Sequence, residues 1–453
     1  MKIRLTIITY LLVSSVIHAQ QEKFFCGTPT LSEEWESEFQ KLISKHKNEL
    51  SGQSQSSINY IIPVIFHVIH GGEPIGTYPN LWQGQILSQL TILNQDFSGS
   101  SYNSSIYPLN AFTNWAVSQN IPSEYLDQNG RIKIADLNIQ FCLATQDTNG
   151  TLLSEPGIDR VNFLSMGLPN PNTYATQNTM RSYLDSILKP QTIWDVTKYL
   201  NVWITDKNNE LSNAGVSSVP PLSGLGDIPN NSTDSTDGIW CYAQAIGSYT
   251  LFPDGNYISE FIDGRTLTHE VGHYLGLRHI WGDMDCGNDF CNDTPPAAGQ
   301  NTGTPSYPHN AGSCAFPSNN PDGDMFMNFM DYTRGPSKYM FTTDQKIRVH
   351  TAIQNSPFRN QLGTHNLCST TNGFNHESII KSTSIYPNPV YTKLNLNFYT
   401  SEIDEIYISN LLGQVLITAK NKNMIDVSDL TNGVYILTIT QGHIKHSQKF
   451  MKE

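Results

Sequence analysis

Three histidines and a glutamate lie close together in THEVGHYLGLRHIWGD, residues 268–283. His269 and His273 are four residues apart, so on an α-helix both imidazoles stand on one face and can reach a single metal ion. Gly276 lets the chain leave the helix in a conformation that other residues resist, which brings His279 round to the same ion. The spacing therefore predicts a metal centre with three histidine ligands.

Three nitrogen ligands leave one position of a tetrahedral zinc site open, as in catalytic zinc centres. Zinc lowers the pKa of a bound water to about 7, and Glu270, beside the first ligand, can take the proton of that water. The alternative is a surface helix that happens to carry histidines, and the added Gly276 and His279 argue against it. We therefore expect His269, His273 and His279 to bind Zn²⁺ and Glu270 to be catalytic.

The elements that must position this motif are those of an α/β domain. A helix is expected at 82–97, where apolar residues recur at helical intervals. Strands and helices that alternate before a zinc helix predict a mixed, twisted sheet, and strand 238–243 is expected along the cleft edge, where an extended substrate would pair with it. The strand-like runs lie at 58–70, 132–144, 159–164, 199–206 and 237–246.

A different composition marks residues 280–326, which are rich in Gly, Pro, Asn and Asp and lack clear periodicity. This segment predicts an irregular lower subdomain that disulfides and bound ions hold in place.

The N-terminus predicts export. Residues 1–19 have two basic residues, a short apolar run and a terminal alanine, as a secretory signal peptide does. Residues 20–57 are polar, with a helix-like stretch and a Ser/Gln-rich end, and predict a propeptide. No later run is long enough to span a membrane. The net charge of −13 argues against nucleic acid as a partner.

An exported chain with seven cysteines is expected to form disulfides, with one cysteine left over. Cys26 lies far from the others and is the natural unpaired one, so the other six could pair among themselves. Their pairing stays open at this point. The six are Cys142, Cys241, Cys286, Cys291, Cys314 and Cys368.

The extended zinc motif resembles that of the metzincin metallopeptidases, which carry a methionine-containing turn downstream. DMFMNFMDYT, residues 324–333, supplies such a turn here. Together with DTPP at 293–296, these motifs look like the pappalysin family, over roughly residues 58–355. The resemblance implies that Met330 forms an apolar floor under the histidines and that Tyr332 supports the tetrahedral intermediate. The alternative for Met330 is an ordinary core methionine.

The chain departs from the family after this turn, where RGPSKYMF replaces a stretch that commonly holds a further cysteine. One family disulfide is therefore absent or rerouted. The same stretch helps to wall the pocket for the residue after the scissile bond. Arg334 and Lys338 make it basic, which argues against a strong preference for cationic side chains.

The resemblance also implies a calcium ion in the loop after the zinc motif, where oxygen ligands suit Ca²⁺. Asp293 and the Thr294 carbonyl are the preferred ligands among a group of loop carboxylates. Solvated turn carboxylates are the alternative. The carboxylates are Asp283, Asp285, Asp289 and Asp293.

Cys26 stands in a CGT element that looks like the one in pappalysin propeptides. A thiolate is a strong zinc ligand, so Cys26 is expected to occupy the open zinc position and keep the proform latent. The alternative is a disulfide from Cys26 to Cys368 or another late cysteine.

The last 70 or so residues differ from the rest. After a polar linker at 369–381, short alternating runs separated by turn residues predict a small all-β sandwich at 382–453. SIYPNPV, ISNLLGQVL and the terminal KFMKE resemble the type A sorting domain of the type IX secretion system. This implies that the secretion machinery is a partner and that the protein is secreted or attached at the cell surface. A carbohydrate-binding or adhesion sandwich is the alternative.

The sequence thus predicts an α/β metzincin catalytic domain at 58–368 followed by the β-sandwich. The expected function is that of a secreted zinc endopeptidase, made as a latent zymogen and acting on proteins or peptides. The alternative from another class is an inactive adhesin or binding protein on a metzincin scaffold. The intact ligands, Glu270 and Tyr332 argue against it.

Overall fold

The structure is a computed structural model, and it describes residues 25–51, 59–101, 107–221, 232–315, 319–368, 384–397, 405–420, 422, 424–441 and 444–453. The expected signal peptide at 1–19 and the linker at 369–381 lie outside these residues. Among the described helices, none combines the length and the apolar character that a membrane crossing requires.

A twisted sheet forms the centre of the large domain. Across the described residues it has seven strands in the order β1-β6-β7-β5-β2-β3, and β4 also pairs with β2. Every pairing is parallel except that of β6 with β7. The strands are β1 (Phe25–Cys26), β2 (Tyr60–His70), β3 (Ile139–Leu143), β4 (Ile158–Asn162), β5 (Leu200–Thr205), β6 (Asn213–Ser217) and β7 (Ile239–Tyr242).

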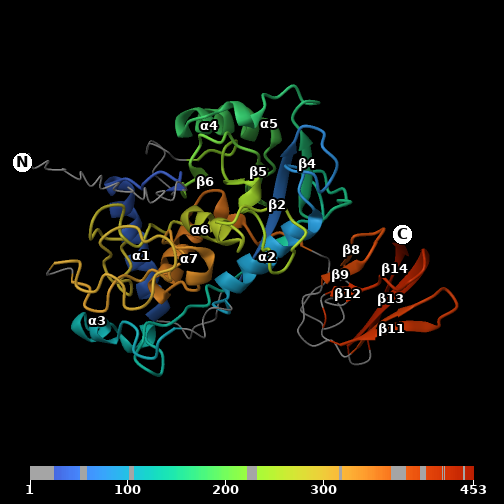
Figure 1. Ribbon diagram of the computed structural model, residues 1–453. Coiled ribbons are helices and arrows are strands. Elements are labelled where there is room, and N and C mark those ends of the chain that lie inside the picture. The colour runs from blue at the N-terminus through green and yellow to red at the C-terminus, as the bar shows by residue number, and fades with distance from the viewer. Residues whose placement is uncertain are drawn as a thin grey trace, which may run out of the picture.

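Helices cover both faces of this sheet, as Figure 1 shows. Side chains of α4 and of the π-helical turn that follows it, Leu184–Leu188, pack on one face with Trp203 and Trp240. Helices α2, α6 and α7 contribute to the core on the other face. Burial on both faces explains why β2 and β5 are almost continuous apolar runs. The α-helices are α1 (Glu33–Ser51), α2 (Gln83–Phe97), α3 (Thr113–Ser118), α4 (Gln177–Tyr183), α5 (Lys189–Thr192), α6 (Arg265–Tyr274) and α7 (Thr343–Asn355).

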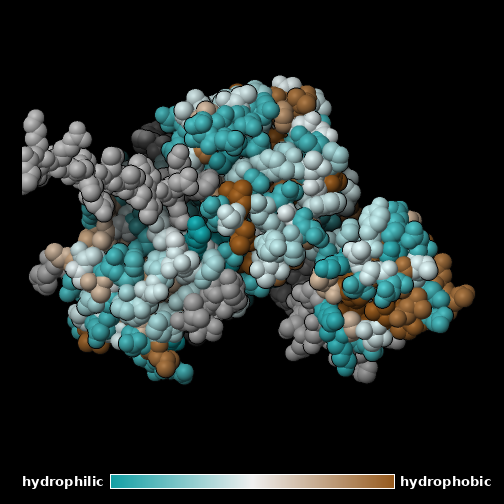
Figure 2. All heavy atoms as spheres, in the orientation of Figure 1, coloured by the Kyte–Doolittle hydropathy of each residue, from teal (hydrophilic) through white to brown (hydrophobic). Residues whose placement is uncertain are grey.

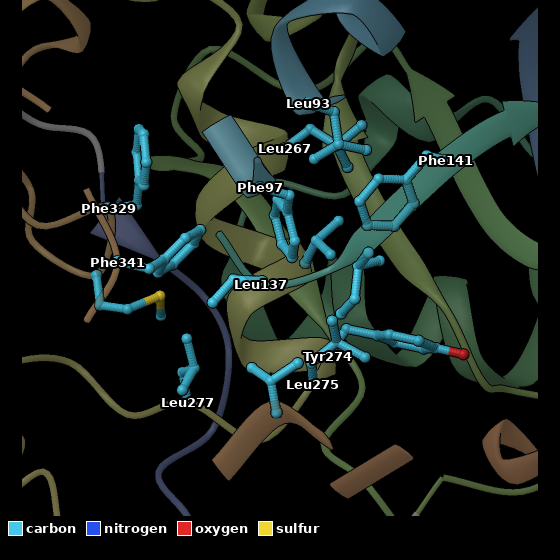
Figure 3. Close-up of a cluster of buried hydrophobic side chains, with 14 of the residues drawn as sticks. Leu93, Phe97, Leu137, Phe141, Leu267, Tyr274, Leu275, Leu277, Phe329 and Phe341 are labelled. Carbon is cyan, nitrogen blue, oxygen red and sulfur yellow. The ribbon is translucent and has the colours of Figure 1, made fainter. Parts of the chain in front are cut away.

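The main core fixes the zinc-motif helix against the sheet. Figure 3 shows Phe97 of α2 beside Leu267 of α6 and Phe141 of β3, with Phe341 from the chain just before α7. The Phe97 ring lies edge-on to Phe141 at 4.9 Å and to Phe341 at 5.1 Å between ring centroids. Such packing is worth several kcal/mol per large side chain, so it holds α6 against the sheet.

The predicted edge strand is wrong. The run 238–243 forms β7, which lies inside the sheet between β5 and β6. The strand beside the cleft is β6, which pairs antiparallel with β7 along one edge. Its other edge is available to another segment. In this structure that edge pairs with β1. β6 has the sequence NAGVS, which lacks the apolar run that marks a strand.

The lower region is irregular, as predicted. Between 280 and 326 the described residues form no α-helix and no β-strand. A disulfide between Cys286 and Cys314 closes part of this loop, and a second joins Cys142 to Cys368. Cys241 and Cys291 are free and buried. The pairing that the sequence left open thus involves four of the six cysteines, and the other two stay as buried thiols.

The C-terminal domain is a small β-sandwich, as predicted. In its described residues a four-stranded sheet, β11-β10-β13-β14, packs on a three-stranded sheet, β12-β9-β8, over a separate apolar core. Figure 2 shows an apolar patch on this domain, where Leu412, Val415 and Leu416 are exposed. The strands are β8 (Ser384–Tyr386), β9 (Lys393–Asn397), β10 (Glu405–Ser409), β11 (Val415–Ala419), β12 (Met424–Asp426), β13 (Gly433–Gln441) and β14 (Ile444–Lys452).

Candidate active site

The helix α6 and the turn after it bring the three motif histidines together. Nδ1 of His269 lies 2.8 Å from the carbonyl oxygen of Phe329, and Nδ1 of His273 lies 2.8 Å from that of Leu277. A carbonyl oxygen only accepts, so in each ring Nδ1 carries the proton and Nε2 is left with a free lone pair. The Nε2 atoms are therefore the ones free to bind a metal ion.

These Nε2 atoms face one another. His273 Nε2 lies 3.1 Å from Nε2 of His269 and 3.1 Å from Nε2 of His279. Burial, followed by the neighbouring histidines, lowers the pKa of His269 well below its ordinary value and that of His273 to about 3. Lone pairs that point at each other across such distances repel unless a cation lies between them. The donor set thus fits a metal ion, and neutral imidazoles suit zinc.

A left-handed turn at Gly276 delivers the third histidine. Gly276 has φ +88°, and a Cβ there would lie 3.2 Å from Cβ of Ala352 and 3.4 Å from Cγ of Pro220. Both the backbone conformation and the close packing therefore require glycine. Beyond the turn, Nδ1 of His279 contacts the Asp283 carboxylate, which also lies 3.6 Å from Arg278.

Asp283 was expected among the loop carboxylates suited to calcium. The structure gives it another contact, because it holds the outer nitrogen of His279. A carboxylate in this position fixes the orientation of a metal-binding imidazole.

Glu270 lies beside the histidines at the cleft edge. Its side chain is buried, and burial raises its pKa to about 7. Gly215 of β6 makes room for it, since a Cβ there would lie 2.6 Å from Cγ of Glu270. The Thr28 hydroxyl donates to Glu270 Oε2 at 2.7 Å. The carboxylate is thus held between α6 and β6, in a setting that suits proton transfer near neutral pH.

Met330 and Tyr332 both lie close to the motif helix and its histidines. Met330 is fully buried under α6, so close that a Cβ at Gly272 would meet its sulfur at 2.4 Å. The ring of Tyr332 lies 5.6 Å from that of His269 and 5.0 Å from that of His279, between centroids. Its hydroxyl-bearing ring therefore borders the metal centre without being one of the converging ligands.

Cys26 reaches this centre from the N-terminal segment. Its sulfur and the three histidine nitrogens all lie within 4.8 Å of one another. Burial raises the pKa of the Cys26 thiol well above its ordinary value, and the nearby Glu270 charge raises it further. A thiolate would form here only beside a cation. Cys26 is free, so the alternative of a disulfide to Cys368 is not the arrangement in this structure.

The N-terminal segment also occupies the cleft edge. β1 pairs with β6, and the Gly27 N–H donates to the carbonyl oxygen of Gly215 at 2.9 Å. Ser217 N–H donates to the Thr28 hydroxyl at 2.7 Å. These contacts fill the edge at which an extended peptide could add a strand.

Helix α1 anchors this segment on α7. The carboxylate of Glu36 forms two contacts of 2.6 Å with the Arg348 guanidinium, and both side chains are buried. Arg348 also donates from Nε to the Gly276 carbonyl at 2.7 Å. Trp35 and Phe39 pack in the same interface. The helix is thereby tied to the very turn that positions His279.

The preferred calcium ligands lie in the predicted loop. Both Asp293 oxygens accept hydrogen bonds at the start of α7, from the Thr342 hydroxyl at 2.6 Å and from the Asp344 N–H at 2.9 Å. Burial raises the pKa of Asp293 to about 7, and the Asp344 charge adds to this. The Thr294 hydroxyl donates to Asp289 at 2.8 Å. Buried carboxylates with raised pKa values gain from a nearby cation.

Several site residues escaped the sequence interpretation. Thr28 stands two residues after Cys26 in the CGT element, so that element was a usable signal. Nothing in the sequence around Gly215 pointed to the site, because the role of this glycine depends on how β6 approaches α6 in space. Lys338, predicted only to make its stretch basic, lines the pocket beside Glu270 and is buried.

Comparisons with known proteins agree on two parts of the chain. A family model described as pregnancy-associated plasma protein-A, peptidase family M43, matches residues 183–354. A model of the secretion system C-terminal sorting domain matches residues 384–453. The first match contains the zinc motif, and the second covers the β-sandwich.

Individual relatives point the same way. An extracellular metalloprotease of Verticillium alfalfae is 31% identical over 241 residues, which cover 52% of this chain and 71% of the relative. One of Colletotrichum graminicola is 32% identical over 136 residues, covering 29% of this chain and 45% of the relative, so the match spans less than half of that protein. A structure of a Tannerella forsythia promirolysin mutant is similar with TM-score 0.52 at 27% identity, over 75% of this chain and 97% of that one.

Proposed function

Because the chain belongs to the M43 family of extracellular metallopeptidases, we propose that it is a zinc endopeptidase made as a latent zymogen. The observation that carries the proposal is the convergence of three lone-pair Nε2 atoms beside the Glu270 carboxylate. The sorting domain and the extracellular relatives mean that the protein is secreted or held at the cell surface. Proteins and peptides are the proposed substrates, and the type IX secretion machinery is the proposed export partner.

His269, His273 and His279 would hold the zinc ion. When bound, zinc polarises the scissile carbonyl and makes water acidic enough to lose a proton near neutral pH. Asp283 and the Phe329 carbonyl keep two of the imidazoles in the ligating tautomer through their outer nitrogens.

Glu270 performs the proton transfers in the proposed mechanism. It takes the proton from the attacking water and then passes it to the leaving amine. In the proform, burial raises the pKa of this carboxyl group, which favours its role as a proton acceptor. Tyr332, whose ring borders the histidines, donates its hydroxyl to the developing oxyanion. The edge of β6 pairs with the substrate backbone once β1 has left it, so longer peptides are the better substrates.

Latency would rest on Cys26. Its sulfur occupies the space that a water molecule needs for attack, and it lies 3.6 Å from Oε2 of Glu270. Thr28 engages the same carboxylate. Removal of the prosegment would free the metal site, the base and the β6 edge in one step.

Calcium is proposed as a second metal ion. Asp293 and the Thr294 carbonyl are the proposed ligands, and the buried, high-pKa carboxylates of this loop support the assignment.

The function is tested with Glu270→Gln in the mature protein. We expect wild type to hydrolyse casein in a chelator-sensitive manner, and the variant to lose at least about 10³-fold of kcat while retaining one zinc per chain and the wild-type melting temperature. A zinc-loaded variant with full activity would overturn the mechanism. A folded, zinc-loaded wild type without any activity would favour the alternative, a binding protein on an inactive scaffold.

A further inference from the structure

A pocket lies beside Glu270 and opens onto the metal site, since His269 and Cys26 are among the residues that line it. Its walls come from the metal site, from β6 and from the segments on either side, and three basic residues are among them, Arg265, Arg334 and Lys338. The residues that the argument uses are Glu260, Asp263, His269, Glu270, Gly335 and Lys338.

This pocket lies on the side of the cleft that receives the residue after the scissile bond. In the proposed function, on which this inference rests, Glu270 delivers a proton to the leaving amine, so the chain that begins with that amine must lie on the Glu270 side. A second hollow, lined by His273, His279 and prosegment residues 28–31, does not touch Glu270. The pocket beside Glu270 therefore receives the first side chain of the leaving product.

Lys338 brings an incompletely bonded cation to this pocket. Its side chain is 7% exposed, and its ammonium donates to the carbonyl oxygen of Asp331 at 3.1 Å. The ammonium has three N–H groups, and among the described residues only this one acceptor is hydrogen-bonded to them. Burial lowers its pKa to about 8, while the Asp331 charge opposes this, so the side chain stays cationic at neutral pH.

The two carboxylates whose charges act most strongly on Lys338, Asp331 and Asp96, have other partners. Asp331 accepts from the side chain and the N–H of Asn301, and Asp96 accepts from Thr268 and lies 3.1 Å from Arg265. Two N–H groups of Lys338 are therefore left for water or for a ligand in the pocket.

The acidic residues of the pocket do not cancel this cation. Asp263 packs against Gly335, where a Cβ would lie 2.4 Å from Cβ of Asp263, and the Arg265 charge acts on it more strongly than that of Lys338. Glu260 accepts from the Ser259 hydroxyl at 2.8 Å. Both side chains are half-buried, whereas Lys338 is buried.

We propose that Lys338 makes this pocket selective for a side chain that ends in acceptor oxygens, glutamate or glutamine, and selective against lysine and arginine. Such a side chain displaces the pocket water and supplies acceptors to the two remaining N–H groups. An aliphatic side chain would leave the two N–H groups of Lys338 buried without acceptors, and this costs binding free energy. A cationic side chain adds repulsion from Lys338.

The test uses mature, zinc-loaded protein and four peptides that differ only after the scissile bond, with Glu, Gln, Leu or Lys. We expect kcat/KM for Glu and Gln to exceed that for Lys by at least about tenfold. Lys338→Met should remove this difference and make Leu the best residue, whereas Lys338→Arg, which keeps the donors, should retain the preference. Lys346→Met, a half-buried lysine of α7 outside the pocket, serves as the matched control and should leave the profile unchanged.

A wild type that prefers Lys or Leu, or a folded Lys338→Met variant with the wild-type profile, would overturn the proposal. Binding of the same peptides to the zinc-loaded protein, followed by fluorescence anisotropy, separates this inference from the proposed function. If no peptide is cleaved but Glu and Gln peptides bind best and lose that advantage in Lys338→Met, the endopeptidase proposal fails and the selectivity stands. If the Lys338 variant binds all peptides as wild type does, the selectivity fails.

Discussion

Tyr332 allows a prediction at the scale of one hydroxyl group. Its ring lies 5.0 Å from that of His279 and packs against Trp281, so Tyr332→Phe keeps the packing and removes only the hydroxyl. If that hydroxyl stabilises the oxyanion, kcat should fall by about 10²-fold while KM changes little. Steady-state kinetics on one peptide substrate would measure both constants, and an unchanged kcat would remove Tyr332 from the mechanism.

Cys26 carries the second prediction at this scale. Cys26→Ser removes the sulfur next to the three histidines, so the proform should become active or degrade itself, whereas wild-type proform stays latent. Cys291→Ser is the matched control, since Cys291 is also a free cysteine but is not part of the histidine cluster. Casein hydrolysis by each purified proform gives the answer. A Cys26→Ser proform as latent as wild type would show that β1 pairing alone blocks the cleft.

At the scale of an element, the docking of α1 should depend on one carboxylate, that of Glu36, which pairs with Arg348 and lies 3.6 Å from Arg278. Glu36→Gln breaks a buried, two-bonded pair with Arg348 and leaves that cation without its partner, so α1 docking should weaken by about 3–5 kcal/mol. Glu38→Gln, which breaks an exposed pair with Lys41, should cost under about 1 kcal/mol. Limited proteolysis of the two proforms should show faster loss of the prosegment in Glu36→Gln, and equal rates would contradict this assignment.

The irregular loop that contains Asp289 and Asp293 should respond to calcium and pH together. Their pKa values are raised to about 7 by burial, so without calcium the folded state loses stability as pH rises from about 4 through 7. Calcium favours the ionised carboxylates, and its stabilisation should therefore be larger at pH 8 than at pH 6. At 100 times Kd it amounts to about 2.7 kcal/mol.

Thermal unfolding with calcium, with magnesium and with chelator would measure this effect. Asp293→Asn should abolish the calcium response. A melting temperature that does not depend on calcium at either pH would exclude the proposed site.

At the scale of the whole molecule, two separate apolar cores predict two folding units. The peptidase core and the sandwich core share no residue, and a ring contact of 5.1 Å between Phe252 and Tyr386 lies between the two domains. A chain that ends at residue 368 keeps the Cys142–Cys368 disulfide and should melt within about 2 °C of the full-length protein. In the native host this truncated chain should stay in the periplasm. Calorimetry and cell fractionation check the two parts, and a collapse of the melting temperature would mean that the domains fold as one.

The sequence alone determined the features that depend on short-range spacing. The positions of His269, Glu270 and His273 follow from helical periodicity, and the left-handed turn at Gly276 from the properties of glycine. Buried parallel strands are readable as apolar runs, so β2 and β5 were predicted, as was the alternation of the C-terminal sandwich. Family resemblance added Met330, Tyr332 and Cys26, because their motifs are local as well.

Only the tertiary structure determined the features that depend on contacts between distant segments of the chain. β6 rather than β7 borders the cleft, because strand order follows from packing and not from the apolar pattern of one strand. The contact of Asp283 with His279, and the cysteine pairs, depend on how an aperiodic loop closes. Lys338 lies next to Glu270 across 68 residues of chain. A basic residue in a loop looks alike in sequence whether it faces water or lies buried in a pocket, and only the fold distinguishes the two.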